Sequence, residues 1–152
     1  MSSDQVKVVS AERMIEAGAA LIFELIANPA RQPEWDGNDN LAVAVDGQRV
    51  RSAGDLFMMT LSMGAIRENH VVEFLEDRLI AWMPAEPAKL PPGHLWRWEI
   101  EPLGENRCLV THTYDWTKLQ DEARFARASA TTSDWLAASI DRLAALAEAN
   151  QD

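Results

Sequence analysis

The sequence predicts an α+β fold in which a curved, seven-stranded antiparallel sheet packs against a long C-terminal helix. Three observations support this prediction. From Leu41 to Trp116 apolar residues recur with a period close to two, which is typical of strands. Short turns separate these segments, and such turns allow only antiparallel neighbours. After Trp135 the apolar period changes to that of a helix.

The first segment, residues 5–14, is rich in valine and predicts a strand. After Gly18, apolar residues follow one another at the spacing of one helical face: Ala19, Ile22, Phe23 and Ile26. Asn28-Pro29 ends this helix and starts a second short helical turn through Trp35, because proline is tolerated at the first helical position and not in the interior. Two short helices are therefore expected after the first strand.

Six further strands are expected before the C-terminal helix. Their predicted ranges are 41–46, 54–62, 66–75, 78–83, 94–102 and 107–116. The segment 84–93 contains four prolines and is expected to be an extended, semi-rigid loop.

The C-terminal helix is predicted from a stripe of apolar residues: Leu136, Ile140, Leu143, Ala144 and Ala147. Thr132, Ser133 and Asp134 are all candidate N-caps. Residues 119–128 form either a separate helix or the start of this one. Since the sheet has no other long element to cover it, we expect the helix to leave a gap on the concave face, and that gap to be a pocket.

Composition limits the possible functions. A chain of 152 residues fits one domain, residues 1–152, and its net charge of −10 argues against a nucleic-acid partner or docking on anionic membranes. No apolar stretch is long enough for membrane insertion. Cys108 is the only cysteine, which excludes an internal disulfide, and Met1 to Gln5 lack the pattern of a signal peptide. A cytoplasmic location is expected.

Alternation assigns the inward faces of three strands. In 94–102 the charged residues alternate with His94, Trp96, Trp98 and Ile100, which are expected to face inward. In 107–116 the inward set includes Cys108, His112 and Tyr114. In 66–75 the same rule places His70 on the apolar face with Val72 and Phe74.

These faces supply candidate ligand-binding residues, in which a few polar groups orient a molecule in a mostly apolar pocket. The predicted set is Met59, His70, Trp82, Trp96, Trp98, His112, Tyr114 and Ile140. The alternative is that the rings only fill the core and that each polar group is satisfied by a neighbour or a trapped water.

Sequence motifs for cofactor chemistry are absent, and no cofactor is expected. His70, His94 and His112 come from different strands without the paired spacing of a metal site, so no metal is expected. An inward Cys108 favours an inert thiol.

Three segments resemble the START-like (SRPBCC) superfamily, in its polyketide cyclase/dehydrase and lipid-transport branch. They are residues 21–29 (LIFELIANP) leading to 33–37 (PEWDG), then 97–102 (RWEIEP) and 110–117 (VTHTYDWT). The resemblance covers nearly the whole chain. It implies a helix-grip fold with a cavity between sheet and C-terminal helix, and a lipid-, sterol- or polyketide-like ligand.

The favoured function is binding of a small hydrophobic molecule. The alternative is a polyketide cyclase or dehydratase in which His112 or His70 acts as general acid/base and Tyr114 as proton donor. A third possibility is a module that meets a partner through an exposed sheet edge or the 84–93 loop. The identity of the ligand and the oligomeric state stay open.

Overall fold

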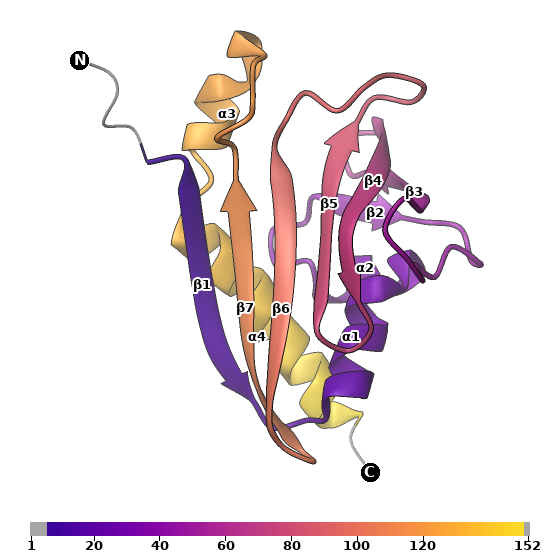
Figure 1. Ribbon diagram of the computed structural model, residues 1–152, viewed down its shortest axis with the longest axis vertical. Coiled ribbons are helices and arrows are strands. Elements are labelled where there is room, and N and C mark those ends of the chain that lie inside the picture. Colours follow the sequence, from indigo (N-terminus) through magenta and orange to yellow (C-terminus); the bar gives the residue numbers. More distant parts are fainter. Residues whose placement is uncertain (1–5, 151–152) are drawn as a thin grey trace.

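The computed structural model describes residues 6–150 and has the predicted architecture (Figure 1). A seven-stranded antiparallel sheet has the order β1-β7-β6-β5-β4-β3-β2, and a long C-terminal helix crosses it. The expectation for Met1 to Gln5, including the first residue of the strand predicted at 5–14, falls outside the described residues. The fold class predicted from periodicity is confirmed.

The strands lie close to their predicted ranges. They are β1 (Val8–Ile15), β2 (Leu41–Val43), β3 (Leu56–Leu61), β4 (Ile66–Leu75), β5 (Leu79–Ala85), β6 (Leu95–Gly104) and β7 (Arg107–Asp115). Strands β2 to β7 form a meander in chain order, and β1 pairs with β7 at the far edge.

The helices occupy the predicted places. They are α1 (Ala19–Ala27), η2 (Pro29–Arg31), α2 (Gln32–Trp35), η3 (Glu122–Arg124), α3 (Phe125–Ser129) and α4 (Ser133–Ala149). The segment 119–128 is thus separate from α4, which begins after Thr132, whose hydroxyl accepts a hydrogen bond from the Trp135 N–H at 3.3 Å. Among residues 6–150 no helix is both long and apolar enough to cross a bilayer.

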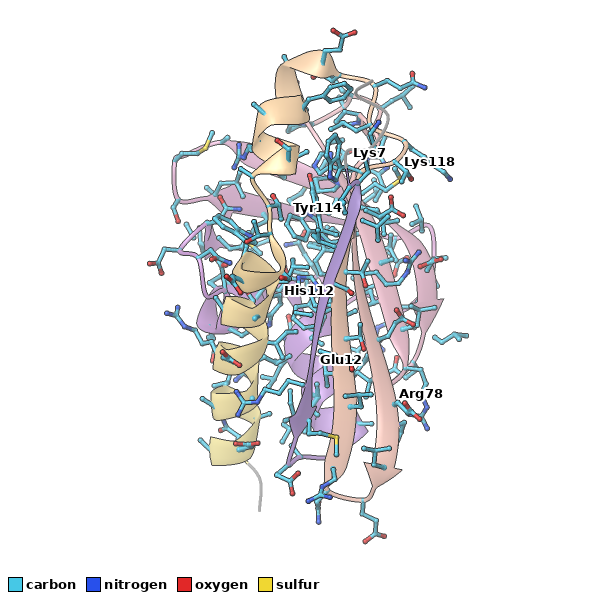
Figure 2. The ribbon with its side chains drawn as sticks, turned by 90° about the vertical axis from the view of Figure 1, so that its left-hand side faces the viewer. Lys7, Glu12, Arg78, His112, Tyr114 and Lys118 are labelled. Atoms are coloured by element: carbon cyan, nitrogen blue, oxygen red, sulfur yellow. The ribbon has the colours of Figure 1, made fainter. Side chains whose placement is uncertain are left out.

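Helices α1 and α4 lie on the same side of the sheet (Figures 1 and 2). Their apolar faces and the inward faces of the strands form a large buried cluster around Phe23, Trp98 and Leu143. A second, smaller cluster near the start of α4 contains Tyr114, Trp116, Leu119, Ala128 and Leu136. The core therefore has two parts along the length of α4.

A bulge in β4 changes which residues face inward. Val71 lies opposite Trp82 and Glu73 lies opposite Ala81, so Val72 is an extra residue in this strand. Before the bulge the inward residues are Arg67, Asn69 and Val71, and after it Phe74. The alternation rule assumed an unbroken strand and therefore assigned the wrong face to the first half of β4.

Strand β5 continues past its predicted end and includes Pro84, which lies opposite Asn69 of β4. Beyond Trp82, which lies opposite Trp96, no further β5–β6 pair is formed. A proline is accepted there because this part of β5 pairs with β4 alone. The sheet thus loses its β5–β6 pairing at the end from which the 84–93 loop emerges.

Gly37, between α2 and β2, lies directly against the backbone of α4. A Cβ atom at Gly37 would come within 2.4 Å of the carbonyl group of Ala138. The Gly37 N–H donates to the Ser139 hydroxyl at 3.1 Å, and the Arg142 guanidinium donates to the Asp36 carbonyl at 2.8 Å. These contacts fix the distance between α4 and the segment that follows α2.

We expect Gly37→Ala to lower the free energy of unfolding by about 1–3 kcal/mol, because the added methyl group forces backbone apart in a packed region. Gly104→Ala is the matched control, since its Cβ would meet nothing within 4 Å. Its effect should stay within about 0.5 kcal/mol. Urea unfolding followed by circular dichroism measures both, and equal effects would contradict the proposed contact.

Candidate functional site

A cavity of about 230 Å³ lies between the sheet, the α2–β2 segment and the N-terminal part of α4. Its walls come from both hydrophobic clusters, with Trp98 and Trp82 from one and Tyr114 and Ala128 from the other. Figure 2 shows His112 and Tyr114 between the sheet and α4, with Tyr114 nearer the end where Lys7 and Lys118 lie. The gap expected from the sequence is thus present on the concave face.

Most of the candidate residues face this cavity. The structure brings six of them together in its wall: Met59, Trp82, Trp96, Trp98, His112 and Tyr114. Their role as ligand contacts stays a prediction, but their common location follows from the register. Trp96 lies opposite Tyr114, and Trp98 lies opposite His112, on adjacent strands.

His70 does not line the cavity, which corrects its predicted inward face. It lies before the bulge, opposite Leu56, which is 53% exposed, and opposite Met83. Its Nε2 atom is 3.0 Å from a carboxylate oxygen of Glu68, a contact without hydrogen-bond geometry. The inward residues of this part of β4 are Arg67 and Asn69.

Ile140 also lies outside the cavity wall. It is buried in the main cluster, while Trp135 and Ser139 are the residues of α4 that border the cavity. The apolar stripe of a helix packs against both the hydrophobic core and the cavity. Periodicity alone therefore cannot tell which residues of the stripe border the cavity.

The His112 imidazole has a fixed orientation. Its Nδ1 atom is 3.0 Å from the Arg97 carbonyl oxygen, and because a carbonyl only accepts, Nδ1 carries the proton. The ring stacks on Trp98 with centroids 3.7 Å apart and an interplanar angle of 12°. Nε2 is therefore the atom left to accept a hydrogen bond.

Burial decides the charge of His112. Removal from water lowers the pKa of the His112 imidazole to about 3, although its hydrogen bond to the Arg97 carbonyl acts in the opposite direction. The imidazole is thus neutral at physiological pH.

Tyr114 contributes a phenol that remains protonated. Burial raises the pKa of Tyr114 to about 12, while Arg127 and Arg124 oppose this rise. Its ring packs against Trp96 at 4.3 Å between centroids. The hydroxyl is thus a hydrogen-bond donor at neutral pH.

Two buried polar atoms beside the cavity lack a hydrogen-bond partner among the described residues: Trp98 Nε1 and His94 Nδ1. By contrast, Trp35 Nε1 donates to the Leu25 carbonyl at 2.7 Å. Unpaired buried polar groups are rare and costly, and a site that binds ligands is one place where they occur.

Sequence reasoning missed several residues of the cavity wall. Arg67, Arg124 and Arg127 surround one end, near His94. Burial, together with the charges of these arginines, lowers the pKa of His94 to about 4. Met59, which was predicted to face the cavity, lies opposite Arg67 across the β3–β4 hairpin. This pairing is the signal that could have identified Arg67 as a residue of the cavity wall. Arg124 and Arg127 come from the segment whose boundaries the sequence left open.

Asp36 is the cavity's carboxylate, and its oxygens accept hydrogen bonds from the backbone N–H groups of Asn38, Asn40 and Leu41. These bonds hold the turn after α2. Within residues 6–150, no three His, Cys, Asp or Glu side chains converge as a metal-binding group.

We expect His112 to make stability depend on pH. Since the unfolded state binds a proton near pH 6.5 and the folded state only near pH 3, the free energy of unfolding should fall as pH drops through this window. His112→Asn, which keeps a donor for the Arg97 carbonyl, should flatten the decline by up to about 1.4 kcal/mol per pH unit. Urea unfolding between pH 7 and 4 measures this.

The control for that experiment is His70→Asn, a histidine substitution outside the cavity wall that leaves His112 in place. An identical slope in His112→Asn and His70→Asn would contradict the buried, neutral state of His112.

No protein-family model matches the chain. An uncharacterized protein of Mycobacterium tuberculosis is 29% identical over 119 residues, with 71% of this chain and 47% of that protein covered. The chain therefore spans about half the length of the curated relatives it matches.

Solved structures show the fold. A START superfamily protein from Mycobacterium smegmatis is 17% identical with a TM-score of 0.66, covering 93% of this chain and 97% of that one. A Mesorhizobium loti protein is 13% identical with a TM-score of 0.69, covering 95% and 99%. Norcoclaurine synthase from Thalictrum flavum, in complex with dopamine and hydroxybenzaldehyde, is 19% identical with a TM-score of 0.61, covering 96% and 88%. The chain has the START-like (SRPBCC) helix-grip fold.

Proposed function

We propose that this chain binds a small hydrophobic molecule in the cavity between the sheet and α4. The observation that carries the proposal is the wall itself. Indole rings from Trp35, Trp82, Trp96 and Trp98 border one space, together with polar atoms that have no partner among the described residues. An apolar wall with a few convergent polar groups is the usual composition of a small-molecule site.

The size of the cavity favours a small ligand. An apolar cavity of about 150 Å³ is enough to bind benzene, and the cavity here measures about 230 Å³. One aromatic ring with a short substituent, or a short acyl chain, suits this volume better than a sterol. The neighbour norcoclaurine synthase, whose structure contains dopamine and hydroxybenzaldehyde, is consistent with single-ring ligands in this fold.

The protonation states of His112 and Tyr114 favour a role in orienting a ligand over a role in acid–base catalysis. A general acid or base works best with a pKa near the operating pH. Burial instead moves the pKa of His112 down to about 3 and that of Tyr114 up to about 12. The imidazole thus serves as an acceptor through Nε2 and the phenol as a donor, and this supports binding rather than the cyclase or dehydratase alternative.

A cytoplasmic location also remains a prediction.

We expect Leu61→Trp to abolish binding, because Leu61 is 5% exposed and lines the cavity, so that an indole there fills the space. Leu56→Trp is the matched control on the same strand, at a position that is 53% exposed. Single-ring aromatic compounds, six- to ten-carbon acyl compounds and cholesterol form the panel. Tryptophan fluorescence and thermal shift measure binding.

If the proposal is correct, single-ring or short acyl compounds bind to the unsubstituted protein and to the Leu56→Trp variant, but not to the Leu61→Trp variant. Circular dichroism checks that both variants keep the fold. Binding that survives in a folded Leu61→Trp protein, or no binding by any member of the panel, would overturn the proposal.

A further inference from the structure

Among the ionisable groups of the cavity wall, basic residues outnumber acidic ones, whereas in the chain as a whole acidic residues outnumber basic ones. The sequence has 24 acidic and 14 basic residues. The cavity wall instead contains three arginines, Arg67, Arg124 and Arg127, against the single carboxylate of Asp36. That carboxylate already accepts three backbone hydrogen bonds. Positive charge is therefore concentrated at this site in an otherwise acidic protein.

The arginines are only partly neutralised. Arg124 is 3.0 Å from Asp121 and 3.8 Å from Glu86. Arg67 and Arg127 form no ion pair with a carboxylate of residues 6–150, and the Arg67 guanidinium donates to the carbonyl of its neighbour Ile66. Guanidinium groups that lack a carboxylate partner are available to an anion.

The three guanidinium groups act on one another and on the same cavity residues. Burial first, and then repulsion from Arg124 and Arg127, lowers the pKa of Arg67, against a smaller opposing attraction from Glu86. Burial first, and then these three charges, lower the pKa of His94, while Arg127 and Arg124 oppose the rise that burial causes in the pKa of Tyr114. An anion placed among them would relieve this repulsion.

We propose that the ligand is an amphipathic anion whose carboxylate or phosphate group lies between Arg67 and Arg127, with its apolar part directed along the indole rings toward Trp98. This inference rests on the proposed function and adds the charge of the ligand. Arg67 lies half-buried in the wall and Arg127 at the exposed rim. The head group thus remains near water while the apolar part is buried.

The arrangement of the wall supports this orientation. Arg67 and Met59 lie opposite each other on β4 and β3, so the charged and the apolar surfaces are continuous. Tyr114, whose phenol is a donor at neutral pH, lies at the arginine end and can donate to the same anion. Hydrogen bonds between charged donors and carboxylates or phosphates are among the strongest in proteins.

The experiment uses four probes with one aromatic ring: 3-phenylpropionate, 3-phenylpropionamide, 2-phenylethyl phosphate and 3-phenylpropylamine. We expect one or both anions to bind at least about tenfold more tightly than the amide at low salt, and the amine more weakly than the amide. The ratio of carboxylate to phosphate affinity identifies the head group. Isothermal titration and NMR line shifts measure the affinities.

Arg67→Gln and Arg127→Gln should each reduce the preference for the anion over the amide several-fold, while affinity for the amide stays nearly constant. Arg78→Gln is the matched control, since Arg78 is an exposed arginine of the β4–β5 turn that lies away from Tyr114 (Figure 2). An equal loss in all three variants would overturn the proposal, because it would reflect net charge alone.

His94 gives a second readout that does not depend on the variants. A bound carboxylate near the arginines should hold the pKa of His94 above its value in the amide complex, and NMR titration of the imidazole protons measures both. Equal affinities for amide and anion, or equal His94 titrations in the two complexes, would overturn the anion and leave the hydrophobic site intact. No binding of any probe would instead count against both proposals.

Discussion

The close approach of Gly37 to α4 fixes the position of the helix segment that borders the cavity. One half of α4 is held by apolar packing, since Leu143, Ala144 and Ala147 are fully buried in the main cluster. The first half is tied to the α2–β2 segment through backbone contacts, with the Gly37 N–H bonded to Ser139. Helix α4 thus meets strands β1 and β7 directly and the α2–β2 segment through Gly37, and the cavity lies where its first half, the segment and the sheet border one another.

The chemistry of that space follows from cross-strand pairing. The registers of β5, β6 and β7 place Trp82 beside Trp96, Trp96 beside Tyr114, and Trp98 beside His112. Trp98 stacks on His112, Trp96 packs at a tilt against Tyr114, and the Arg97 carbonyl fixes the imidazole tautomer. Burial then disfavours the charged form of both polar rings, so that the imidazole and the phenol are neutral near pH 7. Under the proposed function such a wall selects a ligand by shape and hydrogen-bonding pattern, since neither ring has a pKa near neutral pH.

The sequence predicts this fold well because its strands alternate clearly and its turns are short. For β6 and β7 the charged residues mark the solvent face, and Trp98 and His112 were placed correctly. In β4 both faces carry apolar residues, and the bulge at Val72 has no signature in a single sequence, so His70 was assigned to the wrong face. The prediction that Ile140 contacts the ligand was wrong for a different reason. Some residues of the apolar stripe of α4 pack in the core and others border the cavity, and only tertiary packing decides which. Arg67 was missed because the same bulge reversed the faces of the first half of β4, and Arg124 and Arg127 were missed because the boundaries of their segment could not be placed from the sequence.

The position of those arginines explains how an acidic protein can favour an anion. Electrostatic effects of exposed charges decay over roughly 8–10 Å at physiological salt, so scattered surface carboxylates contribute little inside the cavity. Arg67 and Arg127 act at its wall, and the low dielectric of the surrounding indole rings strengthens their field. Asp121 and Glu86 compensate Arg124, but Arg67 and Arg127 have no carboxylate partner among residues 6–150, and like charges close together oppose folding. A negatively charged group supplied by the ligand removes that repulsion, and the site then gains affinity from charges that cost the free protein stability.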